Sequence, residues 1–153
     1  MMRLALAVVL AGFVTSGCDG LFTGENVARF PLQAQAGGYA PLTVTLGPEM
    51  NPIALNLHAE YGANSAEAGK WNSYNATLSK AGSTIASGKF TINNASDPQS
   101  PSAQVVSRTM FIVDVAEVGD FELKIDTTAP LAVTLDKPQL ELRRNIRRDQ
   151  APK

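Results

Sequence analysis

The sequence has little of what most enzymes and nucleic-acid binders use. It holds one cysteine and one histidine, and 18% of its 153 residues are charged. The single cysteine excludes an intramolecular disulfide. The net charge of -1 offers no excess of Lys and Arg to neutralise phosphates, which excludes a nucleic-acid binder. The sequence patterns of a nucleophile elbow, a phosphate-binding Gly loop and a zinc-protease helix are missing too, so we expect no enzyme and no cofactor.

The first residues have the layout of a secretion signal. Arg3 supplies one positive charge, and residues 4–14 contain no charged or strongly polar side chain. This run is too short for a membrane-spanning helix, which needs about 20 residues to cross a hydrocarbon core. We therefore interpret residues 1–17 as a signal peptide that is removed on export.

The apolar run ends in a short motif around the only cysteine. Thr15-Ser16-Gly17-Cys18 resembles the lipobox of bacterial lipoproteins, although Thr15 stands where Leu is usual. The resemblance implies that Cys18 is acylated and becomes the mature N-terminus, which would anchor the chain to a membrane. The alternative is an ordinary secreted protein with an incidental thiol. The motif thus leads us to expect a lipid-anchored protein of the bacterial cell envelope that faces the periplasm. Asp19 resembles the inner-membrane retention signal of enteric bacteria, so the inner membrane is favoured.

The rest of the chain is dominated by apolar and polar side chains that alternate with a period of two. This pattern is typical of strands with one buried face and one solvent-exposed face. It is clearest at residues 53–61, 121–126 and 139–143, and weaker strands are predicted at residues 27–32, 42–46, 74–78, 84–92, 105–115 and 131–135. We predict an all-β chain, with an antiparallel immunoglobulin-like β-sandwich of about 7–9 strands at residues 27–146. Residues 18–26 before it are predicted to be the lipidated cysteine and a tether. Residues 147–153 after it are predicted to be a basic C-terminal tail.

One hexapeptide resembles a corner of immunoglobulin-like domains. In Val118-Gly119-Asp120-Phe121-Glu122-Leu123, a glycine is followed by an aromatic residue and then by a core position. The resemblance implies that Leu55 and Leu123 occupy the places where antibody domains carry their disulfide, and that Trp71 packs between the sheets. Phe121 lacks the hydroxyl of a tyrosine corner. The resemblance therefore concerns architecture and carries no function.

His58 is the candidate for metal chemistry that the sequence offers. It is predicted to lie on the polar face of a strand, and with Met50 and Met110 it would supply the imidazole and thioether ligands that favour copper(I). Met110 lies in an apolar run, however, where a packed core side chain is the ordinary expectation. We favour the interpretation in which His58 is a solvated surface residue and no metal is bound.

Charge is distributed unevenly along the chain. Residues 143–153 contain five basic side chains and one acidic side chain. Arg143, Arg144, Arg147 and Arg148 are therefore candidates for electrostatic contact with anionic headgroups or an acidic partner. The alternative is a final strand followed by a solvated end without structure.

Together these features predict a membrane-anchored envelope lipoprotein that acts as a non-catalytic binding or assembly module. It would contact another envelope protein through an open sheet edge or through the loops predicted at residues 62–70 and 93–102. The alternative is a periplasmic carrier of copper or of a small ligand. A cluster of His58, Met50 and Met110 would favour the carrier.

Overall fold

The computed structural model describes residues 24–62, 70–93 and 105–147, and most of these residues lie in strands. The strands are β1 (Glu25–Pro31), β2 (Ala34–Gln35), β3 (Gly38–Leu46), β4 (Ile53–Tyr61), β5 (Trp71–Lys80), β6 (Ser83–Asn93), β7 (Val105–Val113), β8 (Gly119–Thr127) and β9 (Leu135–Arg144). One 3-10 turn, η1 (Pro48–Met50), stands between β3 and β4. The described part of the chain is therefore all-β, as the alternating pattern predicts.

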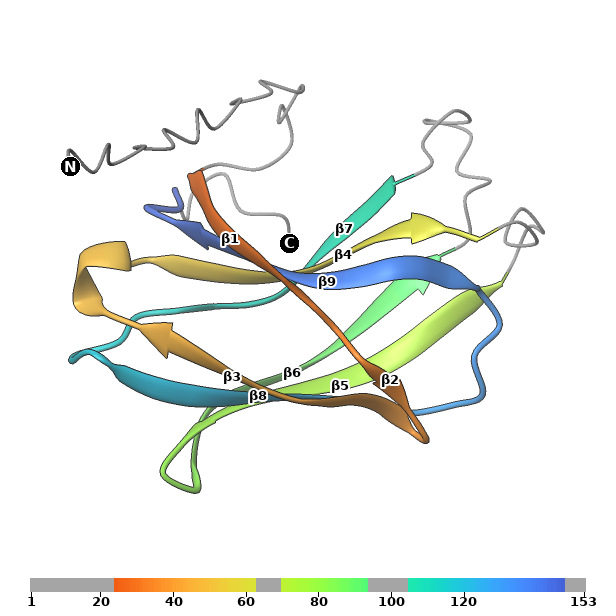
Figure 1. Ribbon diagram of the computed structural model, residues 1–153, viewed down its shortest axis with the longest axis horizontal. Helices are drawn as coiled ribbons and strands as arrows, with labels where there is room; N and C mark the ends of the chain where they lie inside the picture. The colour runs from red at the N-terminus through yellow and green to blue at the C-terminus, as the bar shows by residue number, and fades with distance from the viewer. Residues whose placement is uncertain (1–23, 63–69, 94–104, 148–153) are drawn as a thin grey trace, which may run out of the picture.

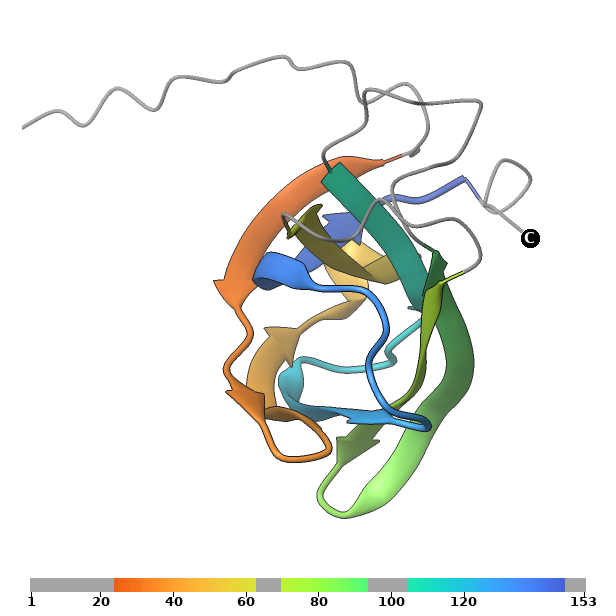
Figure 2. The ribbon, with the colours of Figure 1, turned by 90° about the vertical axis from the view of Figure 1, so that its right-hand side faces the viewer.

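The strands form two antiparallel sheets that face each other (Figures 1 and 2). The four-stranded sheet has the order β1-β9-β4-β7, and the five-stranded sheet has the order β2-β3-β8-β5-β6. The first long strand pairs with the last one, so the four-stranded sheet is complete only when the two ends of the domain meet. The predicted antiparallel β-sandwich is confirmed.

Apolar side chains from both sheets fill the space between the layers. Leu55 and Leu57 of β4 project from one sheet, and Leu123 and Ile125 of β8 project from the other. All four are at most 1% exposed. Because successive side chains of a strand point to opposite faces, burial of one face requires apolar residues at every second position. The core positions predicted for Leu55 and Leu123 are confirmed.

The prediction that Trp71 packs between the sheets is wrong. Trp71 is 58% exposed, because Asn72 and Tyr74 hold the buried face of β5 and Trp71 has the opposite parity. Tyr74 is the aromatic residue that β5 places in the core. Its ring stacks between those of Tyr39 and Phe90, with centroid distances of 6.3 and 5.0 Å.

The strand predicted at residues 131–135 and the predicted tether also differ from the structure. Residues 131–134 lie in the loop between β8 and β9, and the strand starts only at Leu135. The backbone of this loop bonds to a side chain of β5 instead of a neighbouring strand, as described below. At the other end, Glu25 and Asn26 already pair with β9, so the last two residues of the predicted tether belong to the sheet.

Two glycines occupy turns with a positive φ, and they differ in what surrounds them. In the β5–β6 hairpin, Ala81 (φ 48°) and Gly82 (φ 81°) form a two-residue turn with open space around Gly82. Positive φ at both central residues matches the turn type that fits the twist of a hairpin. Gly38 (φ 150°) follows the β2–β3 turn, and a Cβ there would collide with the carbonyl oxygen of Ile125. Of these two glycines, Gly38 is therefore the one required by packing as well as by conformation.

The sandwich has two ends, which we call poles. The N-terminal pole comprises residues 24, 48–52, 114–118 and 145–147, and the distal pole comprises residues 34–39 and 127–135. At the N-terminal pole, the Asn145 N–H donates to the Met50 carbonyl oxygen at 3.1 Å, and the Asn51 side chain pairs with both backbone groups of Val115. β1 leads from this pole to the distal pole, at the left and right of Figure 1.

Candidate functional site

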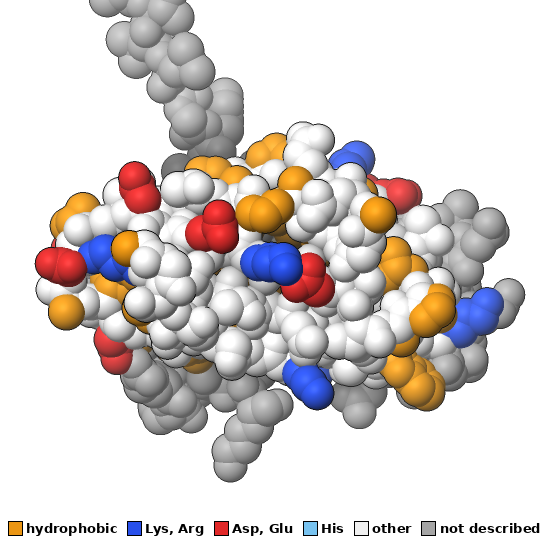
Figure 3. All heavy atoms as spheres, turned by 90° about the horizontal axis from the view of Figure 1, so that it is seen from below, with side chains coloured by type: hydrophobic (Ala, Val, Ile, Leu, Met, Phe, Trp, Pro, Cys, Tyr) orange, Lys and Arg blue, Asp and Glu red, His pale blue; other side chains and the backbone are white. Residues whose placement is uncertain are grey.

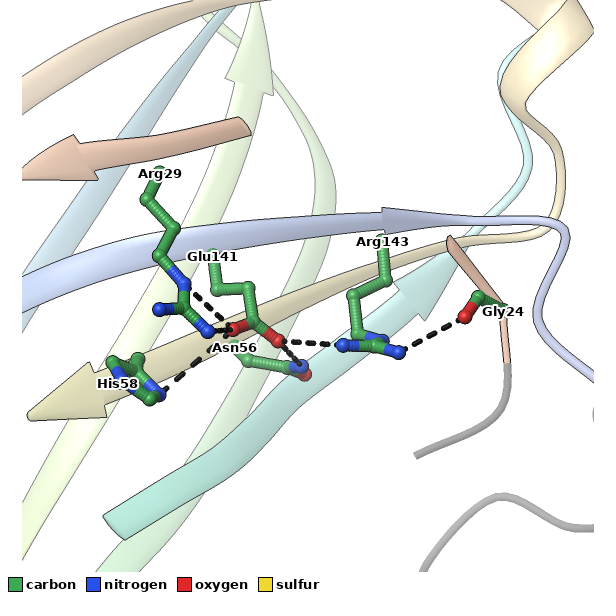
Figure 4. A network of polar contacts seen from close by, with 6 residues as sticks. All are labelled: Gly24, Arg29, Asn56, His58, Glu141 and Arg143. Atoms are coloured by element: carbon green, nitrogen blue, oxygen red, sulfur yellow. Dashed lines mark hydrogen bonds and ion pairs between the residues drawn. The ribbon is translucent and has the colours of Figure 1, made fainter. Parts of the chain in front are cut away.

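The outer face of the four-stranded sheet carries a cluster of charged and polar side chains (Figure 4). The strand register creates it, because Arg29 of β1 pairs with Glu141 of β9, and Glu141 pairs with Asn56 of β4. Arg143 and His58 lie two residues further along β9 and β4, and hence on the same face. We call these five residues the polar network.

Glu141 is the centre of the polar network. Its Oε2 accepts hydrogen bonds from Nε and Nη2 of Arg29 at 3.0 and 2.6 Å. Its Oε1 accepts from Asn56 Nδ2 and Arg143 Nη1, both at 3.3 Å. Glu141 is 2% exposed. A carboxylate buried to this degree needs cations and donors around it, because an unpaired charge in such surroundings is strongly destabilising.

Two opposing effects act on the pKa of Glu141. Burial penalises the charged form and by itself raises the pKa of this carboxyl. The hydrogen bonds and positive charge of Arg29, with the hydrogen bonds from Arg143 and Asn56, outweigh burial, so that the pKa lies below its usual value of 4.5. The carboxylate is therefore ionised at neutral pH. Such a group holds cations in place and is unsuited to donating a proton.

Arg143 belongs to the polar network and is inaccessible to a partner. Its side chain is 3% exposed, and Nη2 donates to the Gly24 carbonyl oxygen at 2.9 Å. Among the other basic residues of the predicted electrostatic contact, Arg144 is exposed and forms an ion pair with β1, and Arg147 is exposed. Arg148 lies outside the described residues. The predicted electrostatic contact with anionic headgroups or an acidic partner would therefore have to use the basic residues after Arg143.

The three candidate copper ligands do not converge. Met50 and Met110 are 8% and 7% exposed and belong to the hydrophobic core between the sheets. His58 lies on the outer face of the four-stranded sheet, with Nδ1 3.8 Å from Glu141 Oε2 and a side chain that is 19% exposed. It is therefore less accessible than the solvated histidine we expected. Among the described residues, no group of three or more His, Cys, Asp and Glu side chains is arranged to hold a metal ion.

Two buried polar atoms, one in the network and one beside it, have no hydrogen-bond partner in the described part of the chain. They are Asn56 Oδ1 and Ser107 Oγ. The Glu141 carboxylate of β9 binds the Arg29 guanidinium of β1 and the Asn56 side-chain amide of β4, and so joins the three strands. The chemistry of the polar network is that of a structural ion cluster.

A cavity at the distal pole is the second candidate site. Its volume is about 690 Å³, and it lies between the β2–β3 turn, the start of β5 and the loop that joins β8 to β9. Figure 2 looks onto this pole and shows the loop crossing from one sheet to the other. The walls include the buried residues Leu32, Tyr39 and Tyr74 and the exposed Leu131. The site therefore connects the surface with the end of the core.

The outer face of the five-stranded sheet is different in character (Figure 3). Acidic and basic side chains are scattered over the face shown, and neither sign predominates. β5 presents polar residues without charge there, among them Ser73, Asn75 and Thr77, and the exposed Trp71 stands at its start. β8 adds the exposed charged residues Asp120, Glu122 and Lys124.

Sequence reasoning identified some of these residues but did not group them. Arg143 and His58 were singled out for other roles, and Arg29, Asn56 and Glu141 were not singled out at all. In the sequence these residues appear only as polar side chains at the outward positions of alternating strands. The strand register, which the sequence does not reveal, brings them together from distant parts of the chain. The cavity has no local signal, because separate segments line it. Cys18 and Asp19, residues 63–69 and residues 94–104 lie outside the described residues.

No protein-family model matches the chain, and no curated protein matches it. Within residues 24–62, 70–93 and 105–147, no helix is long and apolar enough to cross a membrane. The function is therefore inferred from the residues and their geometry.

Proposed function

We propose that this chain is a lipid-anchored, non-catalytic binding domain of a bacterial cell envelope. The observation that carries the proposal is the position of Cys18, which ends the lipobox-like motif seven residues before the first residue of β1, Glu25. Seven residues span at most about 25 Å when fully extended. An acyl anchor on Cys18 would therefore hold the N-terminal pole close to the membrane surface.

The course of β1 gives the anchored domain an orientation. β1 starts at the N-terminal pole, and Leu32, just after its end, donates its N–H to the Pro138 carbonyl oxygen near the distal pole at 2.9 Å. The distal pole is then the free end, and it carries the cavity and the loop of residues 128–134. A partner protein in the envelope would meet this end first.

The alternative functions differ in their support. The proposal of a copper carrier loses its basis, because Met50 and Met110 lie in the core and His58 lies on the outer face of the sheet. A carrier of a small organic ligand keeps the support of the cavity at the distal pole. We therefore retain the small-ligand function as the second candidate.

Metabolic labelling with an alkyne fatty acid tests the anchor. The wild-type chain, produced in a bacterium that makes lipoproteins, should incorporate the label and partition into the detergent phase of a phase-separated extract. Cys18→Ala should do neither, because the acylated thiol is gone. Ser16→Ala keeps a small residue in the motif and should behave like the wild type. An unlabelled wild-type chain, or label retained on Cys18→Ala, would refute the anchor.

Crosslinking in intact envelopes tests the binding function. We expect mass spectrometry to find a reproducible partner protein with the wild-type chain, and to lose it when Cys18→Ala releases the domain from the membrane. A set of captured proteins that is the same for both chains would contradict binding to an envelope protein at the membrane surface.

A further inference from the structure

We propose that the cavity at the distal pole binds an uncharged small molecule with a largely apolar body. This inference rests on the second candidate function, that of a small-ligand carrier, and names the class of ligand for it. It uses residues that take no part in the polar network.

The cavity has the size of a small-molecule site. Its volume of about 690 Å³ falls in the range of roughly 300–1,000 Å³ that is typical of ligand pockets. It reaches inward to Tyr39 and Tyr74, which are 7% and 1% exposed. A ligand inside it would bury part of its apolar surface against these side chains, and burial of apolar surface is the main source of affinity for apolar molecules.

None of the described residues that line the cavity is charged. Besides the two tyrosines, the lining consists of aliphatic residues, prolines, glycines and five neutral polar residues, Gln35, Asn72, Thr127, Thr128 and Thr134. A charged group placed here would lose hydration without gaining a counterion, which is strongly unfavourable. The lining thus selects an electrically neutral ligand.

The phenols of Tyr39 and Tyr74 add no charge to the cavity. Burial, followed by the neighbouring Tyr74 phenol, raises the pKa of Tyr39 far above its usual value. Burial also raises the pKa of Tyr74, although the Asn72 side chain opposes this. Both groups are protonated at neutral pH and provide polar contacts without charge.

One wall of the cavity is held in place by Asn72. Its Oδ1 accepts from the N–H groups of Ala132 and Val133 at 2.8 and 2.9 Å. Its Nδ2 donates to the Val133 carbonyl oxygen and to Tyr74 Oη at 2.7 and 3.0 Å. These bonds use both N–H groups and both lone pairs of the side-chain amide. A wall fixed in this way does not have to be ordered when a ligand enters, which favours binding.

Leu131 stands at the mouth of the cavity. It lines the site and is nevertheless 60% exposed. An exposed leucine beside a concave site offers apolar contact to a ligand that is partly inside. It also allows a substitution at the mouth that leaves the core intact.

Two fluorescent probes of similar shape and different charge test the proposal. Neutral N-phenyl-1-naphthylamine and anionic 8-anilino-1-naphthalenesulfonate are titrated into the full chain carrying Cys18→Ala, in buffer without detergent. We expect the neutral probe to bind with one-to-one stoichiometry and at least tenfold more tightly than the anionic probe. Equal affinities, or no binding of the neutral probe, would overturn the proposal.

A charge placed at the mouth tests where the probes bind. Leu131→Lys should strengthen binding of the anionic probe at least fivefold and leave the urea midpoint unchanged, because the residue is exposed. Val118→Lys is the matched control, since Val118 is 64% exposed and lies at the N-terminal pole. An equal effect of the two substitutions, or no effect of Leu131→Lys, would overturn the assignment to this cavity. The fatty-acid labelling result is independent of both titrations, so a failure of the anchor and a failure of the cavity are distinguishable.

Discussion

Replacing Glu141 by glutamine tests whether the polar network stabilises the four-stranded sheet. The substitution keeps the shape of the side chain and one acceptor oxygen but removes the negative charge. Arg29 can be hydrated instead, because its side chain is 42% exposed. Arg143, with a side chain that is 3% exposed, would remain as a buried cation without its counterion. Breaking a buried pair costs about 3–5 kcal/mol, and we expect about 3 kcal/mol because the glutamine still accepts a hydrogen bond.

Urea unfolding at pH 7 measures this loss. With a slope of about 2 kcal/mol per molar urea, the midpoint of Glu141→Gln should fall by about 1.5 M. Glu60→Gln is the control, since it makes the same change in the same sheet in a pair with Lys137 whose side chains are 45% and 71% exposed. An exposed pair contributes about 0–1 kcal/mol. If the two variants lost the same stability, the assignment of Glu141 as the centre of a buried network would be refuted.

The pH dependence of the same variant gives a second measurement. The folded pKa of Glu141 lies below its usual value of 4.5, so the folded state keeps this carboxylate ionised at a pH where the unfolded chain binds a proton. Its stabilisation is complete above the unfolded pKa and is lost as the pH falls through the folded pKa. The difference in stability between the wild type and Glu141→Gln should therefore shrink below pH 4.5. A difference that stays constant into acid would contradict the lowered pKa.

Further predictions concern the distal pole and the turns. Asn72→Ala leaves backbone groups of the 128–134 loop without partners and should cost about 3 kcal/mol, with hydrogen-exchange protection lost in that loop; retained protection would contradict its role. Gly82→Ala should cost about 1 kcal/mol in urea unfolding and Gly38→Ala clearly more, because a Cβ at Gly38 meets the backbone of β8; equal losses would argue against that contact. Burial raises the pKa of Tyr39 and of Tyr74, so the unfolded state releases these protons first and stability should fall as the pH rises above 10. Replacing both tyrosines by Phe should remove that fall, and an unchanged alkaline profile would show that other groups cause it.

The strands could be predicted because each has one face in a shared core. In β4 and β8 every second residue is apolar, and the period-two pattern follows directly from burial of that face. The resemblance to immunoglobulin-like domains misplaces Trp71 in the core, in conflict with the parity of β5. The parity itself groups Trp71 with Ser73 and Asn75, which project outward.

The sites could not be predicted, because they depend on contacts between distant segments. A strand pattern shows that Glu141 and Arg143 point away from the core, but their burial depends on what the folded chain places around them. Asn72 is a polar residue at a core position of β5, and the sequence does not reveal that the backbone of residues 132 and 133 satisfies it. Leu131 and Val133 alternate with polar or small residues as they would in a strand, although they lie in a loop. Val133 is buried because its backbone is bonded to Asn72.

The pairing of β1 with β9 determines how the domain bears a mechanical load. In the proposed anchored state, a force that draws the distal pole away from the membrane enters at Gly24 and acts along the axis of β1. Six residue pairs join β1 to β9, and backbone hydrogen bonds between antiparallel strands run perpendicular to the strand axis. Such bonds are loaded together in shear and do not open one after another. The bond from Arg143 to the Gly24 carbonyl oxygen reinforces the point where the force enters, so an anchored domain would resist unfolding by such a force.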